Sequence, residues 1–227
     1  MCGRFSLTTA EKQVLLNRFD LEEIPFELKP RYNIAPSQDI PIIQNTNPKI
    51  LTQARWGLIP SWAKDESLSF KMINARAETV NEKPAYKKPF EQKRCLIPAD
   101  SYYEWDKVKN TKTPYRIMLK NEEIFSFAGI WETWNKDGKS ITSCSIITTE
   151  PNELMKKIHI RMPVILSKDK EKDYLNNSPE KALKLLKPFN ATKMKMYQIS
   201  DLVNSPKNDS IEVIKEVKKS TLADFLS

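Results

Sequence analysis

Cys2, directly after Met1, has the most distinctive chemistry in this chain. A residue this small permits routine methionine removal, which would leave Cys2 with a free α-amine beside its thiol. The pKa of an α-amine is about 8, against about 10.4 for lysine, so far more of the amine is neutral at pH 7. The amine can condense with an aldehyde, and the thiol can then close a five-membered ring. The sequence predicts either this aldehyde trap or an ordinary frayed terminus.

Glu104 and His159 are the candidate acid–base groups. Glu104 lies in the aromatic, strand-like run at 101–105, where burial would raise the pKa of its carboxyl and suit it to proton transfer. His159 is the only histidine and lies where a predicted helix gives way to a strand, a junction that often faces a cleft. The structural alternatives are an exposed strand residue for Glu104 and a packed histidine for His159.

Further polar and aromatic residues indicate a binding surface. Asn74, Arg76 and Glu78 alternate along the sequence, so an extended chain would place them on one side, in a binding site or simply in solvent. Arg161 can bind a phosphate through two hydrogen bonds or pair with a carboxylate. Trp62 lies in an aromatic, loop-like segment, where an exposed indole would stack on an unpaired base.

The composition restricts the class of protein. Lys and Arg number 37 against 29 Asp and Glu, and the formal net charge of +8 favours polyanions such as nucleic acid, although many lysines lie in mixed tracts typical of a solvated helix face. The three cysteines are far apart, which argues against a zinc site and for a reducing compartment. Without a leader or a bilayer-spanning apolar run, we expect a cytoplasmic, nucleoid-associated protein with no metal and no organic cofactor.

The predicted elements are short, as expected from 15 prolines and four glycines. Strands are predicted at 40–44, 50–58, 95–98, 101–106, 115–120, 124–131, 140–148, 163–166, 194–199 and 211–217. Helices are predicted from a capping box at Thr8 and Glu11 to about 19, from about 150 to 158, from a cap at Ser167 to about 175, and from Pro179 to about 186. Residues 32–36 are expected either to form a turn stabilised by the Asn33 side chain or to contribute to a functional site.

Strands outnumber helices in this prediction, and hairpins make most of the connections. The pattern predicts an α+β fold, with a curved, barrel-like, mostly antiparallel β core and peripheral helices. Nothing marks a domain boundary, so we expect a single domain over residues 1–227.

Six segments together resemble one family, the SRAP (SOS-response-associated peptidase) proteins, which cross-link abasic sites in single-stranded DNA. They are MCGRF at 1–5, RYNIAP at 31–36, ARWGLIPSWA at 54–63, INARAET at 73–79, RCLIPADSYYEW at 94–105 and HIRMP at 159–163. Beyond Leu166 the resemblance weakens to a general pattern. The family fold is an α+β domain with a barrel-like β core and a basic groove, in agreement with the predicted elements.

The resemblance implies a reaction with the open-chain aldehyde of an abasic deoxyribose. Cys2 would form a Schiff base through its amine and a thiazolidine through its thiol. His159 would protonate the sugar ring oxygen, and Glu104 would transfer protons near the amine. Asn74 would hydrogen-bond the sugar or the reacting terminus.

The resemblance also implies a set of DNA-binding residues: Arg4, Asn33, Trp62, Arg76 and Arg161. The arginines would hold flanking phosphates, Trp62 would wedge against a base, and Asn33 would organise the pocket. The partner would be single-stranded DNA that contains abasic sites, bound by a monomer.

The expected activity is therefore abasic-site cross-linking, accompanied by AP-lyase-like and self-processing peptidase activities. Two alternatives remain. One is a thiol autopeptidase that removes only its own Met1. The other is a non-covalent reader of modified or single-stranded DNA, whose binding would be salt-sensitive, reversible and independent of Cys2.

Overall fold

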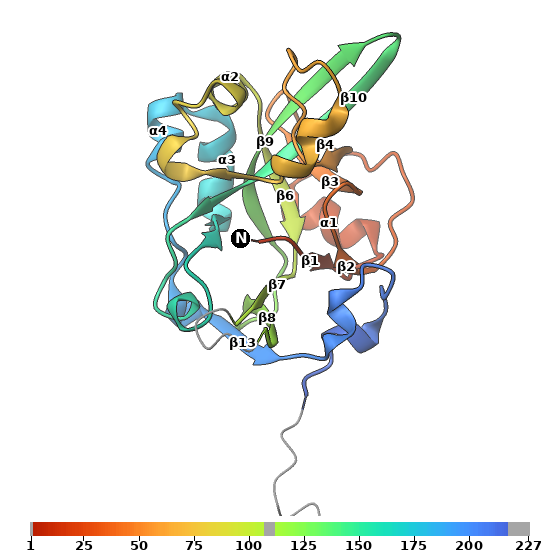
Figure 1. Cartoon of the computed structure of the whole chain (residues 1–227), viewed down its shortest axis with the longest axis vertical. Helices are drawn as coiled ribbons and strands as arrows, with labels where there is room; N and C mark the ends of the chain where they lie inside the picture. Colours follow the sequence, from red (N-terminus) through yellow and green to blue (C-terminus); the bar gives the residue numbers. More distant parts are fainter. Residues whose placement is uncertain (1, 107–111, 218–227) are drawn as a thin grey trace, which may run out of the picture.

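A five-stranded closed β-barrel forms the centre of the computed structural model, which describes residues 2–106 and 112–217 (Figure 1). Its strands are β3 (Asp39–Gln44), β4 (Asn47–Trp56), β6 (Arg94–Ala99), β9 (Phe125–Lys136) and β10 (Lys139–Thr149). Antiparallel pairs join β4, β3, β6, β9 and β10 in that order. A parallel pairing of β10 with β4 closes the ring. The predicted α+β fold with a mostly antiparallel, barrel-like core is confirmed.

A second sheet of five strands carries the N-terminal segment. In spatial order it contains β13 (Met194–Gln198), β8 (Pro114–Leu119), β7 (Ser101–Trp105), β1 (Phe5–Leu7) and β2 (Arg31–Ile34). Short strands extend the barrel: β5 (Asn74–Arg76) and β11 (Met162–Pro163) pair with β10, and β12 (Ile165–Leu166) pairs with β9. Residues 74–76 and 162–163 are therefore both paired with β10.

An aromatic cluster packs the second sheet against the barrel. The ring of Phe5 from β1 meets Trp56 and Phe127 edge-on, with centroids 5.2 and 5.7 Å apart. Tyr102 from β7 also packs edge-on against Phe127, at 6.1 Å. All four side chains are fully buried. Since β1 begins three residues after Cys2, this packing fixes the start of the described chain against the barrel.

The helices lie at the periphery, as predicted. They are α1 (Lys12–Phe19), α2 (Pro84–Gln92), α3 (Lys168–Asn176) and α4 (Pro179–Leu183). Helices α2 and α3 both contact β6 and β9 (Figure 1). None of the helices in the described ranges is long and apolar enough to cross a membrane.

The remaining helical elements are short 3-10 helices of three to six residues. They are η1 (Glu66–Lys71), η2 (Ala77–Thr79), η3 (Met155–Lys157), η4 (Ala191–Lys193), η5 (Asp201–Asn204) and η6 (Ile211–Ile214). The hairpin between β9 and β10 turns at Asp137 and Gly138, both with positive φ (52° and 75°). Asp-Gly is the pair that such a two-residue turn favours.

Three local predictions are wrong. Thr8 does not cap α1, because its hydroxyl and backbone N–H both donate to Asp100. Residues 150–158 form only the turn η3, since the side-chain oxygen of Asn152 accepts the N–H groups of residues 154 and 155. Residues 211–217 form η6 and one bridge to Ile199 instead of a strand. The turn considered as one alternative for the segment around Asn33 is not formed, because Arg31–Ile34 is strand β2 and the Asn33 side chain donates to distant carbonyls.

Arg94 joins two helices to the barrel. Its guanidinium, on a side chain only 3% exposed, donates to five backbone carbonyls, those of Phe90, Glu91, Tyr174, Leu175 and Asn177. These carbonyls lie at the C-terminal ends of α2 and α3, where helix carbonyls have no partner within their own helix. The positive charge also complements both helix dipoles.

Replacing Arg94 with methionine should lower the free energy of unfolding by about 3 kcal/mol or more, because several buried carbonyls lose their donor at once. Urea denaturation measures this change. As a control, Arg55→Met removes a half-exposed pair with Glu66 and should cost less than about 1 kcal/mol. Equal losses in the two variants would contradict this role of Arg94.

Candidate active site

The Cys2 thiol lies buried at the entry to β1. The residue is 0% exposed, and its Sγ lies 3.8 Å from the carbonyl oxygen of Arg4. Burial raises the pKa of the thiol well above its ordinary value, and the negative charge of Glu104 raises it further. The thiol is therefore held in its protonated form, and it needs a base or a donor to react as a thiolate.

Glu104 lies within electrostatic range of this thiol, and His159 lies next to Glu104, although the three residues are far apart in sequence. Glu104, on β7, is 2% exposed, and His159, which follows η3, is 3% exposed. His159 Nε2 lies 3.7 Å from Glu104 Oε2. The structure thus brings together the three residues predicted to carry the acid–base and nucleophilic chemistry.

The backbone of Arg161 holds the other ring nitrogen of His159. Nδ1 lies 3.0 Å from the amide nitrogen of Arg161 and 3.0 Å from its carbonyl oxygen. The N–H can donate to Nδ1 in the neutral ring, and the carbonyl can accept from Nδ1 in the doubly protonated ring. When Nδ1 carries a proton and donates to this carbonyl, His159 can take up or release a proton at Nε2 while it stays bound to the backbone.

Asn74, on β5, holds the segment around Cys2 by a hydrogen bond. Its Nδ2 donates to the backbone carbonyl of Cys2 at 2.8 Å, while its Oδ1 is buried and has no hydrogen-bond partner among the described residues. Strand β5 is kept in place by its parallel pairing with β10, in which Asn74 faces Ile146. An unpaired buried acceptor costs stability, which is expected where a substrate group completes the hydrogen bonding.

The predicted alignment of Asn74, Arg76 and Glu78 along one side of an extended chain ends at Arg76. Strand β5 ends at Arg76, which is exposed, and the chain turns into η2. Glu78 thereby meets the Arg161 guanidinium in a two-bonded pair at 2.7 and 2.9 Å, and this hydrogen bonding lowers the pKa of Glu78. Arg161 also donates to the Thr148 carbonyl, while its Nε is buried and has no partner among the described residues.

Arg4 and Asn33 hold the segment 203–208 against β2. Arg4 donates to Asn33 Oδ1 and to the carbonyls of Val203 and Asn204. Asn33 is fully buried, and its Nδ2 donates to three carbonyls, those of Val203, Ser205 and Asn208. These contacts organise the protein around Arg4, and the predicted DNA contacts of both residues stay predictions.

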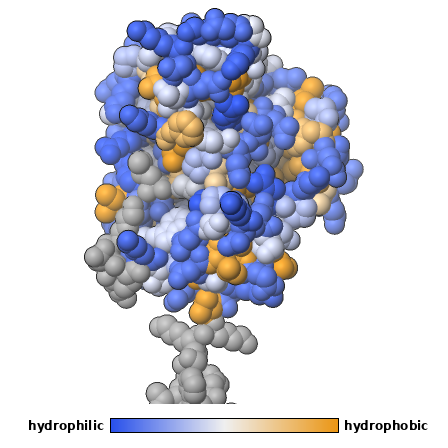
Figure 2. Space-filling view, turned by 45° about the vertical axis from the view of Figure 1, so that its right-hand side comes forward, coloured by the Kyte–Doolittle hydropathy of each residue, from blue (hydrophilic) through white to orange (hydrophobic). Residues whose placement is uncertain are grey.

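Trp62 is 62% exposed, as a base-stacking residue requires. Phe70, at the end of η1, is 70% exposed, and the sequence analysis did not single it out. The face in Figure 2 is mostly hydrophilic, with small and separate apolar areas. Exposed aromatic rings among polar groups are typical of surfaces that bind single-stranded nucleic acid.

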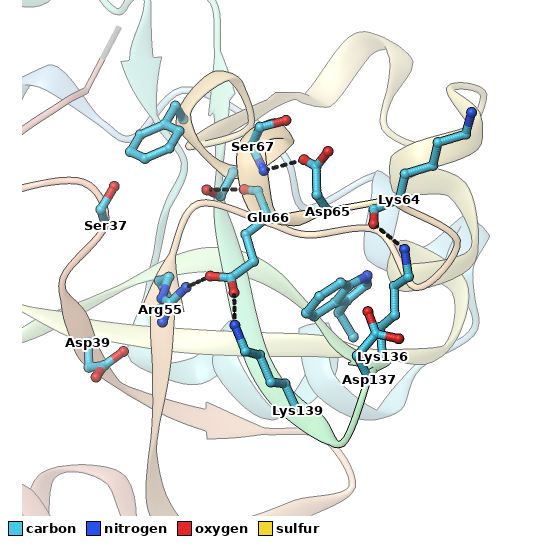
Figure 3. Close-up of a pocket in the computed structure, with 13 residues that line it drawn as sticks. Ser37, Asp39, Arg55, Lys64, Asp65, Glu66, Ser67, Lys136, Asp137 and Lys139 are labelled. Carbon is cyan, nitrogen blue, oxygen red and sulfur yellow. Dashed lines mark hydrogen bonds and ion pairs between the residues drawn. The ribbon is translucent and has the colours of Figure 1, made fainter.

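A cavity of about 740 Å³ lies between the η1 region and the β9–β10 hairpin (Figure 3). None of the nine predicted site residues lines it. Several of its charged groups already have partners within the protein: Glu66 pairs with Arg55 at 2.6 Å and with Lys139 at 3.6 Å, and Lys136 donates to the Lys64 carbonyl. The polar cluster around Cys2, rather than this cavity, therefore identifies the candidate active site.

The described residues contain no group of three His, Cys, Asp or Glu side chains that could hold a metal ion. Tyr102 was missed from the sequence, and for Glu78 the pairing with Arg161 was not predicted. Tyr102 is fully buried, and its hydroxyl has no hydrogen-bond partner among the described residues. The signal for Tyr102 was its position two residues before Glu104, on the same face of a strand.

Residues 1–206 match the family model for the SOS response associated peptidase (SRAP), and the chain belongs to this family. The abasic site processing protein YoaM of Bacillus subtilis is 51% identical, over 94% of this chain and 97% of its own. The abasic site processing protein HMCES of Gallus gallus is 31% identical, over 84% of this chain and 67% of its own.

Solved structures share the fold. A crystal structure from Bacteroides thetaiotaomicron is 32% identical and superposes with a TM-score of 0.87, covering 96% of this chain and 100% of the other. A protein from Bordetella bronchiseptica, at 23% identity and a TM-score of 0.78, covers 88% and 100% and supports the fold alone. The barrel with its attached second sheet is thus the architecture of these proteins.

Glu104→Gln should lower the pKa of the Cys2 thiol, because it removes the negative charge that opposes the thiolate. The pKa should stay above its ordinary value, since burial is the larger cause. The pH dependence of Cys2 alkylation by iodoacetamide, followed by mass spectrometry, measures the shift. Glu66→Gln, outside the cluster, should leave the pKa unchanged. A midpoint that rises or stays fixed in Glu104→Gln would contradict the proximity of the two groups.

Proposed function

We propose that this protein captures abasic sites in single-stranded DNA covalently, through a thiazolidine between Cys2 and the open-chain sugar. The observation that carries the proposal is the burial of the Cys2 thiol together with Glu104 and His159. Relatives that match nearly the whole chain are named abasic site processing proteins, which supports the same substrate.

The chemistry needs no external oxidant or cofactor. After removal of Met1, the α-amine of Cys2 adds to the aldehyde carbon, and loss of one water gives an imine. The sulfur then attacks the imine carbon, a C–S bond forms, and the nitrogen takes up the proton that the thiol releases. The product is a five-membered ring that a lysine could not form, because lysine lacks a neighbouring thiol.

Glu104 and His159 supply the proton transfers in this proposal. Opening of the sugar requires a proton on the ring oxygen, which His159 can deliver from Nε2 while Arg161 holds Nδ1. Glu104 accepts and returns protons beside the amine and the thiol. Both groups are buried, so bulk water competes poorly for the imine.

Asn74 positions the reacting terminus through the carbonyl of Cys2, and its unpartnered Oδ1 can accept a hydrogen bond from a sugar hydroxyl. The exposed Arg76 and Trp62 provide a cation for phosphate and a stacking surface for a neighbouring base. Arg161 contacts His159 through its backbone N–H, while Glu78 orients its guanidinium. These contacts favour a flexible single strand, whose bases are free to stack.

Cys2→Ala should form no denaturation-resistant adduct with a uracil-containing oligonucleotide treated with uracil glycosylase. The variant keeps an α-amine but lacks the sulfur that closes the ring, and its imine hydrolyses on denaturation. Cys144→Ala, which alters another buried cysteine, should still form the adduct. A denaturing gel gives the readout, and equal cross-linking by Cys2→Ala would refute the linkage.

The gel experiment also tests the two alternatives. A non-covalent reader would give a complex that dissociates completely on denaturation. A protein that only removes its own Met1 would show a Glu104-dependent loss of methionine in its intact mass and no DNA adduct. AP-lyase-like activity would appear as cleavage of the oligonucleotide at the abasic position.

His159→Ala should slow formation or reversal of the adduct by about 10²-fold or more, the usual contribution of a positioned acid–base group. Its binding to an oligonucleotide with a tetrahydrofuran in place of the abasic sugar should persist, because that analogue has no aldehyde. Time courses of adduct formation and of adduct reversal provide the measurement. Unchanged rates in both directions would remove His159 from the mechanism.

A further inference from the structure

The Tyr102 hydroxyl is a buried donor without a partner. The side chain is 0% exposed, and the hydroxyl has no hydrogen-bond partner among the described residues. A buried tyrosine hydroxyl normally finds a partner, and an unmade hydrogen bond lowers the stability of the folded protein. Phenylalanine would pack the same space without this penalty, so the hydroxyl calls for a functional explanation.

Tyr102 shares strand β7 with Glu104 of the candidate active site. Tyr102 and Glu104 are two residues apart on β7, so their side chains lie on the same face of the sheet. Tyr102 also pairs directly with Phe5 of β1, the strand that follows Cys2. Burial raises the pKa of the Tyr102 hydroxyl, and smaller increases come from Cys2 and Glu104, which lie within electrostatic range.

The surroundings of the Cys2 sulfur explain what a donor would do there. The sulfur lies 3.8 Å from the Arg4 carbonyl oxygen, which can accept a hydrogen bond but not donate one, and the nearby Glu104 carries a negative charge. Burial and the Glu104 charge both oppose a thiolate, and the carbonyl cannot donate a hydrogen bond to one. The Asn74 amide group is already used on the Cys2 carbonyl. Ring closure, however, requires sulfur to lose its proton.

We propose that the Tyr102 hydroxyl is a further catalytic group, which donates a hydrogen bond to the Cys2 sulfur as the thiol loses its proton and closes the ring on the imine. This inference rests on the proposed cross-linking function. No net transfer from tyrosine occurs: its O–H stays intact, and the thiol proton passes to the imine nitrogen. The unmade hydrogen bond in the free protein is then formed when negative charge develops on sulfur, which favours the transition state.

Tyr102→Phe tests the proposal because it removes only the hydroxyl. The matched control is Tyr103→Phe, one residue along the same strand, where the hydroxyl donates to the Tyr32 carbonyl on the other face. Adduct formation is followed on denaturing gels across a range of pH values. Parallel samples are quenched with sodium borohydride, which reduces the imine to a stable amine and so counts molecules that have not closed the ring.

Tyr102→Phe should slow formation of the denaturation-resistant adduct about tenfold or more, and the rate should rise only at higher pH. The borohydride-trapped fraction should increase, because the amine still forms the imine while ring closure by the sulfur is slower. Its midpoint in urea should be equal to or higher than that of the unaltered protein, since an unpartnered hydroxyl is lost. Tyr103→Phe should keep the original rate and pH profile.

An unchanged rate and pH profile in Tyr102→Phe, with a normal adduct in the unaltered protein, would overturn this inference alone. A marked loss of stability in Tyr102→Phe would also overturn it, because the hydroxyl would then have a structural role. If the unaltered protein forms neither an adduct nor a borohydride-trapped imine, the proposed function fails, and this inference fails with it.

Discussion

The packing of β1 between β7 and β2 is the constraint on which the candidate active site depends. Phe5 anchors this strand in the barrel through Trp56 and Phe127, and three residues earlier the Cys2 thiol is buried beside Glu104. A terminus that would otherwise fray is thus held where a carboxylate and a histidine can act on it. The fold thereby holds Cys2, a chemically unusual residue, in a defined position.

This arrangement lowers the stability of the free protein. A thiol, a carboxyl group and an imidazole are buried together, and nearby polar atoms of Asn74, Tyr102 and Arg161 have no partner in the described structure. Buried polar groups of this kind are unfavourable unless a ligand completes their hydrogen bonds. The closed barrel, the aromatic cluster and the Arg94 contacts provide the stability that offsets them.

The barrel strands were predictable because alternation and turn residues are local signals, as at Asp137 and Gly138. The capping-box prediction was wrong because Thr8 is hydrogen-bonded to Asp100, 92 positions away, and no local sequence pattern indicates such a partner. The Cys2, Glu104 and His159 cluster was predicted through a family resemblance, since their proximity depends on three separate elements. The pairing of Glu78 with Arg161 was missed because it requires β5 to end at Arg76.

The central claim is that the sulfur and nitrogen of Cys2 both bond to the sugar. Tryptic digestion of the cross-linked protein, followed by tandem mass spectrometry, tests it most directly. The account predicts a Cys2-Gly3-Arg4 peptide without Met1, heavier by the abasic nucleotide fragment less one water, with a thiol that no longer reacts with iodoacetamide. DNA attached to a lysine, or a modified peptide that retains Met1, would contradict it.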